Sequence, residues 1–195
     1  MNKKEDNMDN KDKFYVGIPT KNMQSIAPSL VKVIYTSFVM QKEPSITFSD
    51  SSTVCMARSS ILREIGEKSK RRYVRMLWLD SDIFIDNEPQ DLAQILLEAD
   101  ENDMNIVGFY NLADSRGSIT GMDKSNIDKN KFRDIQQHER LSFAGLGFYY
   151  GIADTSYRFH EEINAGEDYF FFMDNNIDVR IEKRIILHHA KYLFI

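Results

Sequence analysis

The sequence predicts a single α/β domain with a mostly parallel central sheet flanked by helices. Segments with strand character alternate with segments of helical periodicity along most of the chain, which is typical of such layered domains. An unbroken apolar run, Met76 to Leu79, ends abruptly at Asp80 and Asp82. A short run of this kind indicates a strand covered on both faces, as in a parallel sheet. With 195 residues and 42% hydrophobic content, the chain can bury one substantial core and has little room for a second domain.

The N-terminal part is expected to contribute little to that core. Residues 1–13 mix Lys, Asp, Glu and Asn with almost nothing to bury, so they predict a disordered tail. We therefore place the folded domain at residues 14–195. Its first strand is expected at Phe14 to Ile18, ended by Pro19 and Thr20. A helix beginning at Pro28 is expected to carry the apolar residues Leu30, Val31, Val33, Ile34 and Phe38.

The middle of the chain continues the alternation. A short strand is expected at Ser45 to Phe48, followed by a helix that one of Asp50, Ser51 and Ser52 caps and that runs to about Lys68. After the Val74 strand come a helix opened by Pro89 and a strand over Met104 to Tyr110. The apolar face of that helix contains Leu92, Ile95, Leu96 and Ala99.

The C-terminal third is less regular. The segment from Asn111 to Arg140 is polar and long, as functional or disordered loops are. Ala144 to Ile152 has strand character, and a short helix is expected from Asp154. An aromatic segment follows Gly166, and a last strand is expected at Asp178 to Leu187.

Asp80 and Asp82 are the first candidate site. If the chain stays extended there, the side-chain period of two places both carboxylates on one side and Ser81 on the other. Ligands of such sheets collect at the carboxyl ends of strands, and carboxylates suit Mg²⁺ or Mn²⁺, which keep positions for water and phosphates. The pair therefore predicts a metal-held diphosphate. The alternative is a solvated turn, because Asp and Ser are common turn formers.

Arg58 is the second candidate, because it lies in the middle of an apolar helical stripe. The stripe consists of Val54, Ala57, Ile61, Leu62 and Ile65. An arginine there must snorkel, pair with a buried acid or meet an anionic ligand. Two interpretations remain: an ion pair with a carboxylate at the edge of the core, or a bidentate contact to a diphosphate.

Two further pairs are candidates near the C-terminus. His188 and His189 follow an apolar run, so one of them is expected to join a metal at the same sheet edge, unless they are ordinary surface or core histidines. Glu167 and Asp168 precede the aromatic segment Tyr169 to Phe172. Burial there would raise a carboxyl pKa toward that of a general base, whereas helix capping is the competing explanation.

Composition excludes several classes. Thirty acidic residues against 25 basic ones provide no overall positive field for nucleic acid. The single cysteine, Cys55, is expected to pack rather than react. No apolar run is long enough for an integral membrane segment and no secretory signal is present, so a cytoplasmic protein is expected, in the host cytoplasm if it is viral. The basic run from Lys68 to Arg72 is expected to be a solvated helix end.

Three short motifs together resemble a known class of enzymes. The run from Val54 to Arg58, the run from Leu77 to Asp82, and Gly166, Glu167 and Asp168 with a closing His188 resemble the GT-A class of nucleotide-sugar glycosyltransferases. The hallmark of that class is an Asp-x-Asp element, and the chain looks most like its compact viral and microbial members. Order and spacing agree over about Phe14 to Tyr192.

The resemblance implies a Rossmann-like GT-A domain and a role for each motif residue. Pro19 and Thr20 would line the nucleotide pocket, Arg58 would contact the nucleotide or its phosphates, and Asp80 would face the ribose and metal. Asp82 would bind Mn²⁺ or Mg²⁺ directly. His188 would be the third metal ligand or touch the diphosphate, although the glycine of the family's His-x-Gly element is missing here.

The resemblance also implies the reaction. In inverting members the acid of the Glu-Asp element deprotonates the acceptor hydroxyl, a role that falls to Asp168 with Glu167 as substitute, whereas retaining members need no base. The donor would be a UDP- or GDP-sugar, and the acceptor a glycan, a protein or a lipid-linked group. The strand from Gly145 to Gly151 would approach the donor sugar, and the segment from Asn111 to Arg140 would form an acceptor lid.

Two rival functions are open. A sugar-phosphate nucleotidyltransferase also holds a diphosphate and a cation on an α/β sheet, but it usually has a Gly-rich phosphate loop after the first strand. Phe14 to Asn22 contains only Gly17. The other rival is a non-catalytic GT-A-like binding protein that uses the basic run from Lys68 to Arg72 to meet an anionic surface.

Overall fold

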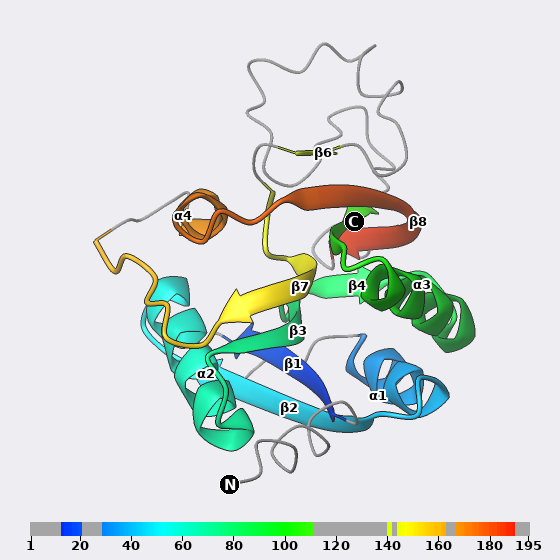
Figure 1. The fold of residues 1–195 in the computed structure, drawn as a ribbon, viewed down its shortest axis with the longest axis horizontal. Coiled ribbons are helices and arrows are strands. Elements are labelled where there is room, and N and C mark those ends of the chain that lie inside the picture. Colours follow the sequence, from blue (N-terminus) through cyan, green and yellow to red (C-terminus); the bar gives the residue numbers. More distant parts are fainter. Residues whose placement is uncertain (1–12, 21–28, 111–139, 142–143, 163–166, 190–195) are drawn as a thin grey trace, which may run out of the picture.

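The computed structural model describes residues 13–20, 29–110, 140–141, 144–162 and 167–189, and these form one sheet with helices on both faces (Figure 1). The side chains of residues 109, 110 and 189 are not described. Several predictions therefore lie outside the described residues: the tail before Lys13, the role of Pro28, and nearly all of the segment from Asn111 to Arg140.

Strands and helices follow one another in largely the predicted order. The strands are β1 (Lys13–Thr20), β2 (Glu43–Asp50), β3 (Tyr73–Leu79), β4 (Ile83–Ile85), β5 (Asn105–Tyr110), β6 (Arg140–Leu141), β7 (Phe148–Asp154) and β8 (Val179–His189). The helices of the described residues are α1 (Leu30–Val39), α2 (Val54–Ser69), α3 (Pro89–Glu101) and α4 (Glu167–Asp174). None of these helices is long and apolar enough to cross a membrane.

The sheet is mixed, so the expectation of a mostly parallel sheet is wrong. Its strand order is β2-β1-β3-β7-β5-β8-β4, with β6 paired to β8. The β1–β2, β1–β3 and β5–β8 pairs are parallel, whereas β7 runs antiparallel to both of its neighbours, β3 and β5. Parallel neighbours need a long crossover connection, and α1 and α2 provide it for the first three strands. Within the described part of the chain, no helix lies between β5 and β7.

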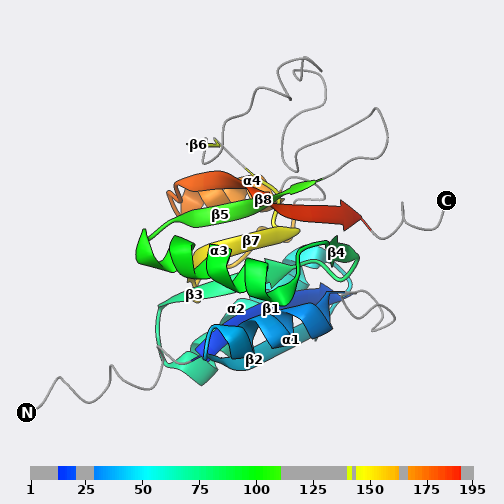
Figure 2. The same ribbon diagram turned by 90° about the vertical axis from the view of Figure 1, so that its right-hand side faces the viewer.

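The helices form two layers. In Figures 1 and 2, α1 and α3 cover one face of the sheet and α2 and α4 the other. The strands separate two apolar clusters by the alternation of their side chains. In β3, Leu77 and Leu79 pack toward the α1 and α3 side, whereas Met76 and Trp78 pack toward α2 and α4. A central strand with both faces buried confirms the interpretation of the apolar run.

Helix α2 begins one residue later than the predicted caps. Its N-cap is Thr53, whose hydroxyl oxygen accepts a hydrogen bond from the backbone N–H of Met56 at 3.2 Å. The prediction of Asp50, Ser51 or Ser52 is wrong because β2 extends to Asp50 and Thr53 is the residue with extended backbone next to the helix.

The helix expected from Asp154 is not found in residues 155–162. Asp154 is the last residue of β7, and its carboxylate accepts hydrogen bonds from Arg72 at 2.9 and 3.0 Å and from the backbone N–H of Ser156 at 2.8 Å. An aspartate in such a turn can resemble a helix cap in the sequence, since both use the same side-chain acceptor.

Candidate active site

The carboxyl ends of β1 and β3 meet the N-terminus of α2 at a pocket of about 310 Å³. Its lining combines strand ends, the cap region of α2 and the turn after β3. The lining residues are Pro19, Thr20, Ser51, Ser52, Thr53, Val54, Ala57, Asp80, Ser81 and Asp82. Four residues that the sequence analysis placed in one site, Pro19, Thr20, Asp80 and Asp82, therefore lie together.

The two carboxylates reach the pocket from a turn rather than from an extended strand. Strand β3 ends at Leu79, and the backbone N–H of Ile83 donates to the carbonyl oxygen of Asp80 at 3.1 Å. The condition of an extended Asp-Ser-Asp segment is therefore wrong, since these residues follow their turn propensity. Asp80 and Asp82 nevertheless both line the pocket.

Arg58 is bound by carboxylates from two other parts of the chain. Its Nη2 donates to Asp80 at 3.0 Å, and its Nη1 donates to Glu167 at 3.1 Å and also to Asp168. The Arg58 side chain is 2% exposed, and its guanidinium lies 5.9 Å from the centre of the Phe159 ring. These contacts confirm the ion-pair interpretation of Arg58. We call Arg58, Asp80, Glu167 and Asp168 the arginine cluster.

The arginine cluster has more negative than positive charge. Burial alone would lower the pKa of Arg58, but Asp168, Asp80 and Glu167 together raise it, so the guanidinium stays charged. Three ionised carboxylates around one guanidinium leave two negative charges in excess. Within the described part of the chain, Nε of Arg58 has no hydrogen-bond partner, so one buried donor is not used by the cluster.

Asp168 has the most perturbed carboxyl group of the cluster. Burial raises its pKa to about 6, Arg58 opposes that rise, and the neighbouring Glu167 and Asp80 add to it. Its other oxygen accepts a hydrogen bond from the backbone N–H of Leu146 at 3.0 Å, which fixes the orientation of the carboxyl group. Asp168 lies in the first turn of α4, where the helix dipole favours an acidic residue. That preference does not explain why its carboxylate binds the buried Arg58.

The segment before β7 forms hydrogen bonds with both Asp168 and Asp80. Leu146 binds Asp168, and the carbonyl oxygen of Gly147 accepts a hydrogen bond from the backbone N–H of Asp80 at 2.9 Å. Residues 146 and 147 thus lie against Asp168 and Asp80, whereas the approach of the Gly145 to Gly151 stretch to a donor sugar stays a prediction. The sequence marked the stretch by its glycines but did not indicate either hydrogen bond.

His188 lies on β8, next to the strand that follows the turn of the two aspartates. It is paired in register with Phe84 of β4, and its ring centre lies 6.2 Å from that of Phe84. Its Nε2 lies 3.8 Å from a carboxylate oxygen of Asp86. Among the described residues, no group of three His, Cys, Asp or Glu side chains is arranged to hold a metal ion. The role of His188 as a third ligand therefore stays a prediction, and the side chain of His189 is not described.

The pocket also contains residues that the sequence analysis did not select. Thr53, Val54 and Ala57 bring the first turn of α2 to the pocket, so the helix N-terminus faces Asp80 and Asp82. The signal that could have identified them is the run of Ser and Thr before an apolar helical stripe, which was interpreted only as a cap.

The basic run after α2 is a helix end. Lys68 pairs with Glu64 at 2.6 Å, Lys70 is the left-handed C-cap residue, and Arg72 pairs with Asp154. These contacts agree with the predicted solvated helix end and place the run away from the residues that line the pocket.

Comparisons with known proteins bear on the fold. A scan against protein-family models and a search of curated proteins found no match. Among solved structures, the chain is similar to the crystal structure of A197 from STIV, a viral protein, with a TM-score of 0.58 and 19% sequence identity. The alignment covers 91% of this chain and 84% of that chain. At this identity the similarity shows a shared α/β fold and nothing about activity.

Proposed function

We propose that the protein is a metal-dependent glycosyltransferase of the GT-A type that transfers a sugar from a UDP- or GDP-sugar to a hydroxyl acceptor. The observation that supports this most is the pocket in which Asp80 and Asp82 face the N-terminus of α2, next to a partly buried carboxyl group, Asp168, with a raised pKa. A diphosphate, a cation and a general base are the three parts that an inverting transfer of this kind needs.

The donor set at the turn after β3 fits Mg²⁺ or Mn²⁺ held in part by substrate. These ions are usually bound through one or two carboxylates together with water and phosphate oxygens, and a pocket with two aspartates offers that set. Asp80 uses Oδ1 to accept from Arg58, so its second oxygen is the one we assign to the cation, together with Asp82. A bound cation would supply charge neutralisation for the leaving diphosphate.

The first turn of α2 supports diphosphate binding. Backbone N–H groups of a helix N-terminus point along its axis and carry partial positive charge, and Thr53 and Val54 place that terminus in the pocket wall. We assign the diphosphate to the space between this terminus and Asp82, and the nucleoside to the wall formed by Pro19 and Thr20.

Asp168 is assigned as the general base of an inverting transfer. A carboxyl group with a pKa of about 6 is ionised at neutral pH and is more basic than an ordinary aspartate. Arg58 holds it through one oxygen and Leu146 holds it through the other. Glu167 shares the Arg58 contact and is the substitute. Arg58 therefore acts on the base and on Asp80 directly, rather than on phosphate as the motif resemblance implies.

The proposal is tested by calorimetry and a transfer assay. Titration with UDP- and GDP-sugars in the presence of Mn²⁺ should show binding that disappears with EDTA. Incubation with a nucleoside triphosphate and a sugar phosphate should release no pyrophosphate, which separates this function from a nucleotidyltransferase. A folded protein that binds no nucleotide sugar with metal present would contradict the proposal and favour a non-catalytic binding protein. A glycan, a protein and a lipid-linked group are the acceptors to compare.

A further inference from the structure

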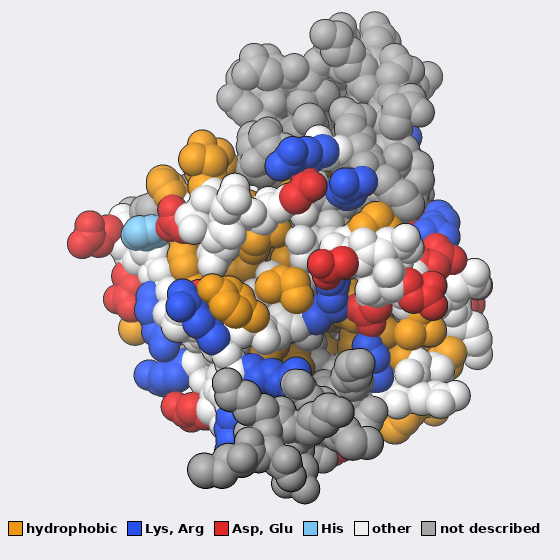
Figure 3. Space-filling view, viewed as in Figure 1, with side chains coloured by type: hydrophobic (Ala, Val, Ile, Leu, Met, Phe, Trp, Pro, Cys, Tyr) orange, Lys and Arg blue, Asp and Glu red, His pale blue; other side chains and the backbone are white. Residues whose placement is uncertain are grey.

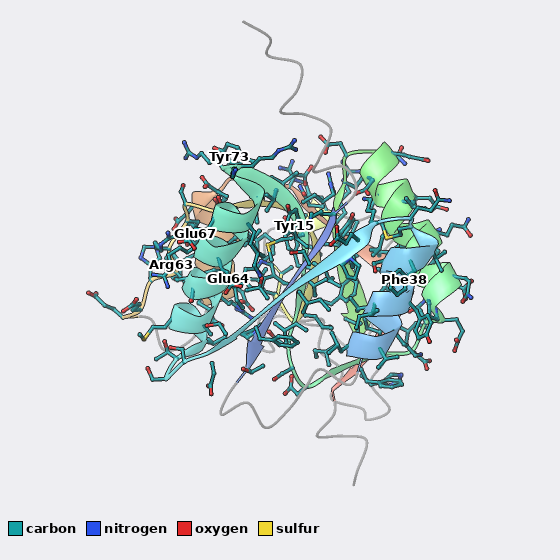
Figure 4. All side chains as sticks on the ribbon, turned by 90° about the horizontal axis from the view of Figure 1, so that it is seen from below. Tyr15, Phe38, Arg63, Glu64, Glu67 and Tyr73 are labelled. Carbon is teal, nitrogen blue, oxygen red and sulfur yellow. The ribbon has the colours of Figure 1, made fainter. Side chains whose placement is uncertain are left out.

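The outward face of α1 is apolar. Val31, Tyr35 and Phe38 are 63%, 59% and 60% exposed, and their spacing of four and three residues places them on one stripe of the helix. Phe38 marks this face in Figure 4. The opposite side of α1 is apolar as well, but it is buried: Val33 is fully enclosed in the core. A helix with apolar side chains on both sides has a second surface available for burial.

A groove continues this surface onto α3. The two helices pack side by side (Figures 1 and 2), and the groove between them has a volume of about 390 Å³. Val39 and Leu97 add exposed apolar area to it. The groove is lined by Val39, Gln90, Ala93, Gln94, Leu97, Glu98 and Glu101. We call the α1 stripe and this groove the α1/α3 face.

The rim of the α1/α3 face is negatively charged. Helix α3 contains no Lys or Arg and has four acidic residues: Asp91, Glu98, Asp100 and Glu101. Asp100 binds Lys42 at 2.6 Å, and Glu98 binds Arg184 at 2.7 Å. Asp91 and Glu101 are exposed and form no ion pair among the described residues. Figure 3 shows acidic side chains over α3 beside hydrophobic ones, at the right of the view.

The outward face of α2 is the contrasting case. It presents Arg63, Glu64 and Glu67 to solvent (Figure 4), and Glu64 forms an ion pair with Lys68 one turn away at 2.6 Å. Mixed charges of this kind are typical of a helix face that stays in water. The apolar stripe of α1 is therefore a property of that helix and not of all helices in the protein.

We propose that the α1/α3 face binds a cationic amphipathic helix of a partner protein. Apolar side chains of that helix would fill the groove and cover Tyr35 and Phe38. Its Lys or Arg residues would face Glu101 in the groove and Asp91 in the first turn of α3, which lies two helical turns before the groove-lining Glu98. Charge decides among the possible occupants. A second copy of this chain would bring two acidic rims together, and an anionic membrane surface would meet the same repulsion.

The apolar part of the proposal is tested with a synthetic peptide. The probe is a fluorescein-labelled amphipathic helix of about 16 residues with Leu at helical spacing and Lys on the other side. The double variant Tyr35→Ser/Phe38→Ser should raise the dissociation constant at least about tenfold, because anchors buried at an interface dominate affinity. Tyr73→Ser is the matched control, since Tyr73 is 56% exposed on β3, away from this face. Circular dichroism confirms that each variant is folded.

The charge part is tested separately. Asp91→Lys/Glu101→Lys should weaken binding of the same peptide severalfold, whereas Glu64→Lys/Glu67→Lys on α2 should not. A peptide with Glu in place of each Lys should bind poorly. Equal binding of the acidic and basic peptides, or unchanged affinity in Tyr35→Ser/Phe38→Ser, would overturn the proposal. Two other results would also overturn it: dimerisation seen in light scattering, or sedimentation with phosphatidylcholine vesicles, if either is lost in Tyr35→Ser/Phe38→Ser. Each would show that a second copy of the chain or a membrane, rather than a partner helix, binds this face.

Discussion

The turn after β3 has two carboxylates in different environments. Asp80 belongs to the arginine cluster. Its carboxylate accepts a hydrogen bond from Arg58, and its backbone N–H donates to the carbonyl oxygen of Gly147. Asp82, two residues on, lines the pocket at the start of β4 and is not part of that cluster. We therefore expect two different roles. Asp80 helps to neutralise Arg58 within the fold, and Asp82 contacts a ligand that binds in the pocket.

The largest effect is expected at the centre of the buried side. Arg58→Met removes the guanidinium that, among the described residues, pairs with all three of Asp80, Glu167 and Asp168. Removing one partner from a fully buried ion pair costs about 3–5 kcal/mol, and this is the upper bound for the fall in the free energy of unfolding in a urea titration, because the three carboxylates left behind are partly exposed. Arg63→Met, on the exposed side of the same helix, is the control and should change stability by less than about 0.5 kcal/mol. An Arg58→Met protein as stable as its parent would mean that the cluster contributes nothing to folding.

How far the sequence predicts this cluster depends on the distance of each contact along the chain. The apolar stripe of α2 shows that Arg58 is buried and needs a partner, because helical periodicity is local. The identity of the partners is not local, since Glu167 and Asp168 lie 109 and 110 residues further on. Only the motif resemblance placed them in the same site, and it assigned Arg58 to phosphate rather than to the base.

The direction of β7 shows the same limit for the fold. Strand character over Phe148 to Asp154 follows from composition, but its position between β3 and β5 depends on pairing that no local pattern encodes. Strand β4 has only three residues, Ile83 to Ile85, which is too short for a periodic signal. Strand character at β7 was therefore predicted, whereas its position and direction in the sheet and the short strand β4 were not.

The next effect concerns Asp168, the proposed base. Asp168→Asn keeps an oxygen that can accept from Leu146 but cannot take a proton from an acceptor hydroxyl. Loss of a general base reduces the rate by about 10²- to 10⁴-fold, whereas the affinity for the nucleotide sugar should stay unchanged because Asp168 is not among the pocket-lining residues. Stopped transfer assays and calorimetry measure the two quantities. If Glu167→Gln has the larger effect on rate, the two carboxylates exchange roles.

A smaller effect is expected from pH. The rate should fall about tenfold per pH unit below the pKa of Asp168, which is about 6, and should level off above it.

The contribution of Asp168 to the free energy of unfolding changes with pH in the opposite sense. The folded-state pKa lies above the ordinary value of 3.8, so the folded protein binds this proton more tightly than the unfolded chain does. That contribution is fully present below about pH 4 and is lost as the pH rises through about 6. Asp168→Asn should remove both dependences, and a rate profile without an inflection near pH 6 would assign the base elsewhere.

The smallest effect on stability, and the sharpest test of the comparison, is expected on the open side. Asp82→Asn should lower the free energy of unfolding by less than Arg58→Met does, because Asp80, Glu167 and Asp168 are the carboxylates that bind the Arg58 guanidinium. The affinity for Mn²⁺ in the presence of nucleotide should nevertheless fall at least about tenfold, since hard cations depend on charged oxygen ligands.

His188→Ala is the variant to compare with Asp82→Asn. Its ring lies against Phe84 and near Asp86, so Mn²⁺ affinity should stay within about twofold of the parent value if Asp82 and Asp80 hold the ion. A loss of metal affinity in His188→Ala as large as that in Asp82→Asn would restore the histidine to the metal site, which β8 adjoins because it pairs with β4 directly after the turn.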